Sequence, residues 1–194
     1  MGKIFYIMGK SSAGKDTIFK KVKEMIPKLR PIVLYTTRPI REGETDGVEY
    51  FFTNKAGLDK MQAAGKVVES RTYDTVHGEW IYFTADDGQI DLKNYNYIAI
   101  GTLVSYEKIR AYFGKEAVLP IYIEVEDGER LFRALLRERR QEEPKYAEMC
   151  RRFLADTEDF SEENLVRLGV THRFYNQNVE ECIEQIVLGI REKM

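Results

Sequence analysis

A glycine-rich segment near the start of the chain has the residue types needed to hold phosphate groups. It comprises Gly9, Lys10, Ser11, Ser12, Ala13, Gly14, Lys15 and Asp16. This order matches the phosphate-binding pattern G-x-x-x-x-G-K-[ST] except at its last position. In such a loop, successive backbone N–H groups point at a phosphate, and the N-terminus of the following helix adds positive potential. The segment therefore predicts a nucleotide-binding loop, in which Lys15 reaches the outer phosphates of a nucleoside triphosphate.

The last position of this loop departs from the pattern. Asp16 stands where a Ser or Thr hydroxyl would bind Mg²⁺ directly, and Thr17 comes one position too late to replace it. A carboxylate can bind the ion through water or cap the helix N-terminus. We therefore count Asp16 and Thr17 with the nucleotide-binding residues and leave the metal ligands unassigned, with a water-mediated contact open to Asp16.

Two arginines and a tyrosine form a second candidate anion site. Arg38 and Arg41 are three residues apart, Pro39 restrains the chain between them, and Tyr50 follows nine residues after Arg41. Guanidinium groups bind phosphate through paired hydrogen bonds, and a phenol adds another donor. The alternative is a basic surface loop, because isolated arginines are mostly solvated.

The segments that must position these residues alternate between strand-like and helix-like patterns. Apolar runs typical of strands covered on both faces lie at 3–8, 95–100 and 118–125. Apolar residues at helical spacing mark helices at 15–26, 104–113 and 179–190. A strand before the loop and an amphipathic helix after it separate the loop from a chance glycine-rich turn. We expect an α/β fold of the P-loop NTPase type, with a three-layer parallel sheet and helices on both faces.

Two stretches break this alternation. Residues 31–84 are rich in Tyr, Phe, Thr and Gly and predict a small mixed insertion that binds the acceptor. Residues 127–160 are strongly charged and predict a helical lid, broken at Pro144 and bearing several arginines. We therefore expect a single domain over 1–194. Its core would comprise 1–30, 85–126 and 161–194.

Composition excludes several classes of protein. Thirty Lys and Arg oppose thirty-two Asp and Glu in 194 residues, which argues against a general nucleic-acid binder. The hydrophobic fraction of 43% excludes an intrinsically disordered chain, and no apolar run approaches the roughly 20 residues of a membrane span. The opening segment predicts a strand and not a signal peptide. Two distant cysteines without a metal-ligand pattern favour a reducing, cytoplasmic compartment.

The order and spacing of these motifs resemble the guanylate kinase family. The nucleotide loop is followed over residues 36–50 by T-T-R-x-x-R-x-G-E-x-x-G-x-x-Y, and the resemblance continues along the whole chain. It implies an enzyme that uses ATP and Mg²⁺ to convert GMP or dGMP to the diphosphate. The implied partners are small-molecule nucleotides, with no nucleic acid and no membrane, and the implied state is a monomer or homodimer.

The resemblance also implies roles for individual residues. Those expected to hold the acceptor phosphate are Arg38, Arg41, Tyr50 and Tyr82. Glu69 resembles the glutamate that reads guanine N1 and N2, and Thr84 resembles a serine whose hydroxyl touches the base. The expected lid arginines, which close over the transferring phosphate, are Arg133, Arg137 and Arg152, and Asn176 resembles an asparagine near the adenine of ATP. On their own, Glu69 and the pair Arg133 and Arg137 would be read as solvated side chains.

Some positions depart from the family pattern. Leu34 and Tyr35 stand where the family has a serine that helps to read guanine, and Gly101 stands where it has an aspartate. These departures keep two alternatives open. One is a kinase of the same fold with a different small-molecule acceptor, and the other is a non-catalytic guanylate-kinase-like binding module. The intact pair of Gly14 and Lys15 argues against the second alternative.

Overall fold

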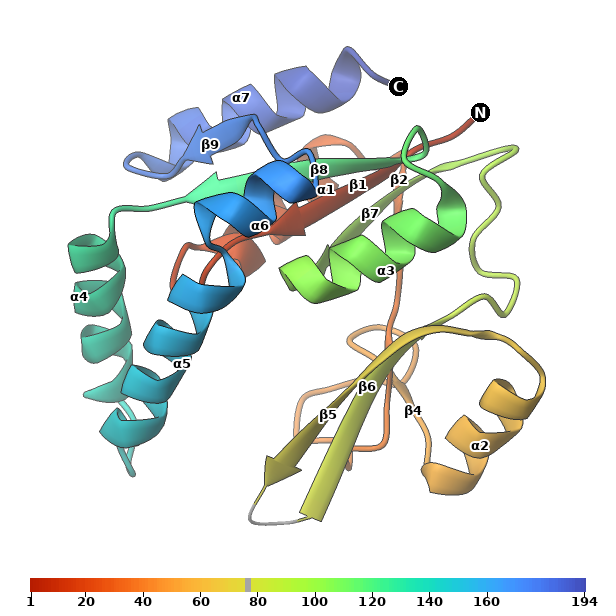
Figure 1. Cartoon of the computed structure of the whole chain (residues 1–194), viewed down its shortest axis with the longest axis horizontal. Helices are drawn as coiled ribbons and strands as arrows, with labels where there is room; N and C mark the ends of the chain where they lie inside the picture. Colours follow the sequence, from red (N-terminus) through yellow and green to blue (C-terminus); the bar gives the residue numbers. More distant parts are fainter. Residues whose placement is uncertain (76–77) are drawn as a thin grey trace.

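A five-stranded parallel sheet lies at the centre of the molecule (Figure 1). Its strands are β1 (Ile4–Met8), β2 (Leu29–Pro31), β7 (Asn96–Gly101), β8 (Val118–Glu124) and β9 (Arg173–Tyr175). They lie in the order β2-β7-β1-β8-β9, and the neighbouring strands pair in parallel. The computed structural model describes residues 1–75 and 78–194. The predicted α/β fold with a parallel sheet is confirmed.

Helices cover both faces of this sheet, so the core has three layers (Figure 1). Alternate residues of β1 point into two separate hydrophobic clusters. One cluster is closed by α1 (Lys15–Met25) and α7 (Val179–Arg191), and the other by α3 (Leu103–Phe113) and α6 (Glu162–Arg167). Because both faces are covered, every residue of β1 is buried, as its continuous apolar run predicts.

The ends of the core helices follow local signals in the sequence. Helix α1 ends two residues before Pro27, which cannot continue a helix. Helix α3 ends before Gly114, whose φ of 92° suits glycine. Helix α7 begins after Asn178, whose side chain accepts hydrogen bonds from the backbone N–H groups of Glu180 and Glu181. The three predicted helices are therefore confirmed.

A second, four-stranded sheet is built from the segment between β2 and β7. It contains β3 (Tyr35–Thr36), β4 (Phe51–Phe52), β5 (Val67–Thr75) and β6 (Gly78–Ala85), in the order β4-β3-β6-β5. One face packs on α2 (Lys55–Ala63) through Leu58, Ile81 and Phe83. Side chains alternate along a strand, so Tyr82 and Thr84 lie on the opposite face. That face turns toward the core and carries the candidate acceptor residues.

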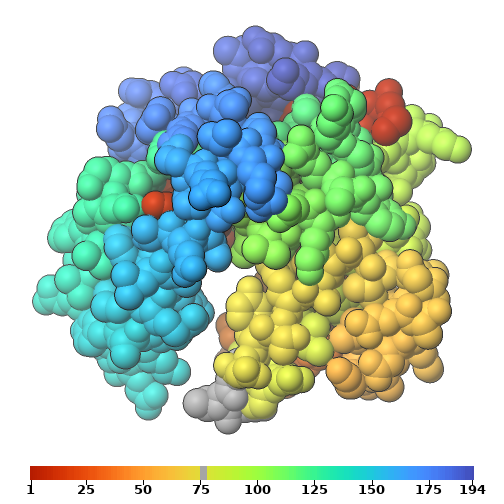
Figure 2. Space-filling model, viewed as in Figure 1, coloured from red at the N-terminus to blue at the C-terminus, as the bar shows by residue number. Residues whose placement is uncertain are grey.

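Two charged helices project from the other end of the core. They are α4 (Asp127–Glu138) and α5 (Tyr146–Asp159), which together form the predicted helical hairpin. Figure 2 shows a hollow between this hairpin and the sheet of β5 and β6. Over the described ranges, no helix combines the length and apolar character that crossing a membrane would require.

Candidate functional site

The glycine-rich loop connects the end of β1 with the start of α1, the position that a phosphate-binding loop requires. Ser12 has a φ of 63° and Gly14 a φ of 88°. A Cβ atom on Gly14 would lie 2.6 Å from Nδ2 of Asn176. Glycine is therefore needed at position 14 for both its backbone angle and its small size.

Lys15 points back over its own loop. Its Nζ donates a hydrogen bond to the carbonyl oxygen of Lys10 at 3.0 Å. Burial lowers the pKa of Lys15, while the charges of Asp156 and Asp16 raise it. The ammonium group therefore lies in a poorly solvated place where an anion would bind strongly. Asp16 and Thr17 are exposed at the start of α1.

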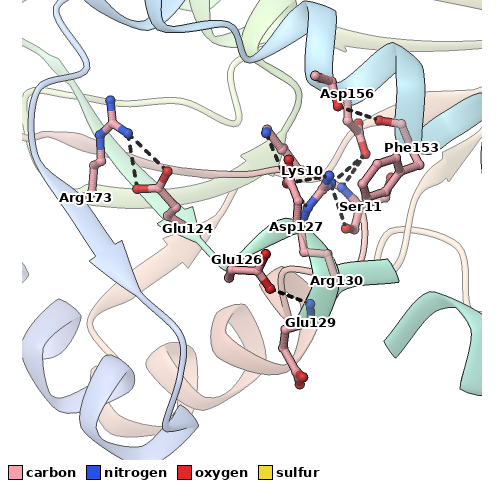
Figure 3. Close-up of polar contacts among 11 residues, drawn as sticks. Lys10, Ser11, Glu124, Glu126, Asp127, Glu129, Arg130, Phe153, Asp156 and Arg173 are labelled. Carbon is pink, nitrogen blue, oxygen red and sulfur yellow. Dashed lines mark hydrogen bonds and ion pairs between the residues drawn. The ribbon is translucent and has the colours of Figure 1, made fainter. Parts of the chain in front are cut away.

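A buried arginine connects the charged hairpin to the loop (Figure 3). Arg130 of α4 is only 1% exposed, and its guanidinium lies 3.0 Å from Oδ1 of Asp127 and 3.5 Å from Oδ2 of Asp156. It also donates to the carbonyl oxygen of Ser11 at 3.4 Å and lies 4.5 Å from the ring centroid of Phe153. Both helices of the hairpin, α4 through Arg130 and α5 through Asp156, thus contact the nucleotide loop at Ser11.

The carboxylate of Asp156 makes the shortest of these contacts. Its Oδ2 accepts a hydrogen bond from the backbone N–H of Ser11 at 2.6 Å. Neither Arg130 nor Asp156 was among the predicted site residues. One signal was present, because Arg130 shares a helical face with the buried Ala134.

The three predicted lid arginines differ in their surroundings. Arg133 donates to Glu129 at 2.7 Å and to the carbonyl oxygen of Asn176 at 3.2 Å. Arg137 is half exposed, lies 3.9 Å from Glu138, and is close enough to lower the pKa of Lys15. Arg152 is exposed and pairs with Glu148 at 3.0 Å. Arg137 is the arginine of this set whose charge acts on Lys15.

Asn176 supports the loop backbone. It is buried, and its Nδ2 donates to the carbonyl oxygen of Ala13 at 2.9 Å. The residues on either side of it, Tyr175 and Gln177, line a cavity of about 260 Å³ that also reaches Lys10. A contact between Asn176 and adenine stays a prediction, and this cavity is the space in which to look for it.

On the second sheet, the structure brings three of the four predicted phosphate-binding residues together. Arg38 is buried, forms a two-point ion pair with Glu44 at 2.7 and 2.9 Å, and donates from Nε to the hydroxyl of Tyr82 at 3.2 Å. The Tyr50 ring lies 5.4 Å from the Arg38 guanidinium and 5.5 Å from the Tyr82 ring. Arg41 is exposed, with its guanidinium 5.7 Å from the Trp80 ring. Glu44 was not among the predicted site residues.

Glu69 is held by a set of donors from several elements. Its Oε1 accepts from the Thr84 hydroxyl at 2.8 Å, and its Oε2 accepts from the Ser105 hydroxyl at 3.2 Å. The Nε atom of Arg71 lies 3.3 Å from the same Oε2. Sequence patterns did not single out Ser105 or Arg71. The available signal was the two-residue spacing that puts Glu69 and Arg71 on one face of β5.

Two of the departures from the family pattern have a structural explanation. A Cβ atom at Gly101 would lie 2.1 Å from the hydroxyl oxygen of Tyr6, which fills that space. Tyr35 stacks on Phe83 with ring centroids 5.0 Å apart, and its hydroxyl donates to Asp87. Position 101 therefore has no room for a carboxylate side chain while Tyr6 stays in place.

Comparisons with known proteins find similarity to guanylate kinases. Residues 1–82 match the family model for guanylate kinase. A guanylate kinase from Syntrophotalea carbinolica is 39% identical over 77 residues, which are 40% of this chain and 35% of that protein. One from Frankia casuarinae is 46% identical over 63 residues, 32% of this chain and 34% of that protein. The alignments thus span about a third of the relatives' own length.

The fold similarity extends further than the sequence similarity. The crystal structure of guanylate kinase from Anaplasma phagocytophilum superposes with a TM-score of 0.64 and 20% identity, over 100% of this chain and 87% of that chain. At this identity the match concerns the fold alone. The chain is therefore similar in sequence to guanylate kinases over its first 82 residues, and it shares their fold over its whole length.

Proposed function

We propose that this protein transfers a phosphoryl group from ATP to a nucleoside monophosphate, with GMP or dGMP as the acceptor. The observation that carries the proposal is the presence of two candidate phosphate sites, the loop with Lys15 and the cluster of Arg38, Tyr50 and Tyr82 on the second sheet. Burial raises the pKa of Tyr50, and the charge of Asp16, at the start of α1, also acts on it. A triphosphate in the loop and a phosphate beside Tyr50 would have to come together for the transfer.

The transfer needs no nucleophile from the protein. An oxygen of the acceptor phosphate attacks the terminal phosphorus of ATP, the bond to the bridging oxygen breaks, and ADP leaves with that oxygen. Lys15 and Arg137 would stabilise the charge that develops on the transferred group. Arg38, Tyr50 and Tyr82 would hold the acceptor phosphate in line with it.

A magnesium ion would fit this arrangement if the phosphates of the substrate supplied most of its ligands. Within the described residues no cluster of three or more His, Cys, Asp or Glu side chains is placed to hold a metal. Mg²⁺ is usually bound by substrate phosphates with only one or two carboxylates. Asp16 is the one carboxylate of the loop itself and would contact the hydrated ion, which neutralises phosphate charge when bound.

Closure of the hollow would protect the reaction from water. Without exclusion of water, ATP would be hydrolysed, so a kinase of this kind closes its flaps over the substrates. We propose that the hairpin of α4 and α5 and the second sheet are those flaps, moving on the core at 1–30, 85–126 and 161–194.

A second candidate is a kinase of the same fold with another phosphorylated acceptor. It is favoured by Gly101, where the hydroxyl of Tyr6 leaves no room for a carboxylate. A non-catalytic module has less support, because the loop keeps Gly14 and Lys15 in a geometry suited to phosphate.

The direct test is a panel of nucleoside monophosphates with ATP and Mg²⁺, assayed for ADP release. We expect turnover with GMP or dGMP, and loss of about a hundredfold or more in kcat in Lys15→Ala, since one preorganised donor contributes roughly 3 kcal/mol to the transition state. Lys20→Ala, an exposed change on the same helix, is the matched control. Activity in Lys15→Ala within about threefold of the parent would remove the loop from the mechanism. Binding of ATP without turnover of any monophosphate would favour the second candidate.

A further inference from the structure

The pairing of β5 with β6 arranges the acceptor face of the second sheet in rows. Glu69 lies opposite Thr84, and Arg71 lies opposite Tyr82. Directly opposed side chains share one face of a sheet, with Cβ atoms about 5 Å apart. The row of Glu69 and Thr84 holds the candidate base-reading groups, whereas Tyr82 belongs to the candidate phosphate site. The register therefore places Arg71 in the phosphate row, next to the row of Glu69.

The two arginines predicted to hold the acceptor phosphate leave it few buried donors. A guanidinium has five N–H donors. Arg38 donates four of them to protein acceptors, which are the Tyr82 hydroxyl, the carbonyl oxygen of Pro39 and both carboxylate oxygens of Glu44. Arg41 is exposed. Neither arginine therefore combines a sheltered position with several unused donors.

Arg71 has the unused donors that Arg38 lacks. Its side chain is 16% exposed, and its Nε atom lies 3.3 Å from Oε2 of Glu69 in an ion pair. Within residues 1–75 and 78–194, no group accepts a hydrogen bond from its guanidinium, although the Nε atom is buried. A buried donor without an acceptor is unfavourable. Arg71 would therefore gain from an acceptor that offers better hydrogen-bond geometry than Glu69 does.

The charge of Arg71 also acts on the phosphate row. Burial and the charge of Tyr82 raise the pKa of Tyr50, whereas the charges of Arg38 and Arg71 lower it. The Tyr50 and Tyr82 rings are 5.5 Å apart. Both guanidinium groups thus contribute positive potential to the place where the two tyrosines meet, which favours an anion there.

We infer that Arg71 binds the acceptor phosphate, and that it leaves its ion pair with Glu69 when this phosphate enters. This inference rests on the proposed kinase function. Phosphate oxygens accept paired hydrogen bonds from a guanidinium, which the contact with Glu69 does not provide. Glu69 keeps its hydrogen bonds from Thr84 at 2.8 Å and from Ser105 at 3.2 Å after the exchange. The buried carboxylate is therefore not left without partners when Arg71 moves.

The test compares GMP with guanosine, which lacks the phosphate, by calorimetric Kd measurements on the parent protein and on Arg71→Met. Methionine keeps an unbranched apolar stem and removes the donors. Because hydrogen bonds to a charged group are lost, we expect about tenfold or more weaker binding of GMP and a change within about threefold for guanosine. The Kd for ATP should not change, which also shows that the variant is folded. Lys66→Met removes an exposed cation just before β5 and is the matched control.

The ratio of the GMP and guanosine affinities decides the inference. Equal weakening of both ligands in Arg71→Met would overturn it, because Arg71 would then act on the nucleoside or only on the fold. An unchanged Kd for GMP in this variant, or no binding of GMP by the parent protein, would also overturn it. Arg71→Lys keeps the charge but not the paired donors, so its Kd for GMP should lie between those of the parent protein and Arg71→Met.

A parallel assay of phosphoryl transfer from ATP to GMP separates this inference from the proposed function. Binding of GMP that depends on Arg71, without transfer, would support the inference and remove the proposed activity. Transfer to GMP, together with a ratio of GMP to guanosine affinity that is unchanged in Arg71→Met, would overturn the inference and leave the activity standing.

Discussion

Replacing Asp156 by Asn should tighten ATP binding while making the unliganded protein less stable. The Asp156 carboxylate accepts from the backbone N–H of Ser11 at 2.6 Å and lies near Lys15, whose pKa it raises. It therefore supplies negative charge at a loop that we propose to bind a triphosphate. ATP must displace this carboxylate before it can use the same amide and the same lysine.

The structure sets the size of both effects. A hydrogen bond to a charged group contributes about 1.5–3 kcal/mol, and the Asp156 side chain is 17% exposed, so screening reduces this somewhat. In the Asn variant a neutral hydrogen bond can remain, which leaves a loss of about 1–2 kcal/mol. Arg130 keeps Asp127 as its other partner. If ATP displaces the contact in both proteins, its loss should appear as lower stability and as a roughly 5- to 30-fold lower Kd for ATP.

Calorimetric titration with ATP and chemical unfolding without ligand measure the two quantities. Glu158→Gln removes one exposed charge from the same helix and should change neither. The reasoning fails if Asp156→Asn binds ATP more weakly than the parent protein. That result would make Asp156 a residue that supports the bound nucleotide.

Three further predictions concern the second sheet and the core. Gly101→Ala places a Cβ atom 2.1 Å from the Tyr6 hydroxyl, so it should lower the free energy of unfolding by about 1–3 kcal/mol. Adding Tyr6→Phe should recover part of this loss. An unchanged free energy of unfolding in denaturant titrations would contradict the close packing. Hydrogen bonding to Arg38 lowers the pKa of Glu44 from 4.5 to about 2, so the ion pair should stabilise the protein fully above about pH 4.5 and progressively less as the pH falls toward 2. In Glu44→Gln the melting temperature should depend less on pH between about 4.5 and 2. A pH dependence equal to that of the parent protein would refute the stabilising role of the ion pair between Arg38 and Glu44. Binding of a bisubstrate analogue should reduce the radius of gyration in small-angle scattering, and saturation without any change would count against closure of the flaps.

Local patterns in the sequence determined the elements of the core and the kind of chemistry. The apolar run of β1, the proline after α1 and the asparagine before α7 each act over a few residues, so they can be recognised without tertiary structure. The loop that ends in Gly14 and Lys15 is equally local, because consecutive amides and one lysine make up its candidate phosphate site. The short α2 and α6 were not predicted, since neither has a long periodic pattern.

Only the tertiary structure decided which charged side chains share a site. Ser11 meets Asp156 across 145 positions, and Glu69 meets Ser105 across 36. Such partners are chosen by the packing of α5 on the loop and of α3 on β5, which no local spacing encodes. The burial of Arg130 likewise depends on where α4 lies, because a basic, amphipathic helix has the same sequence pattern whether its arginine faces water or a loop. Arg130 and Asp156 are therefore residues whose place beside the loop only the folded structure could identify.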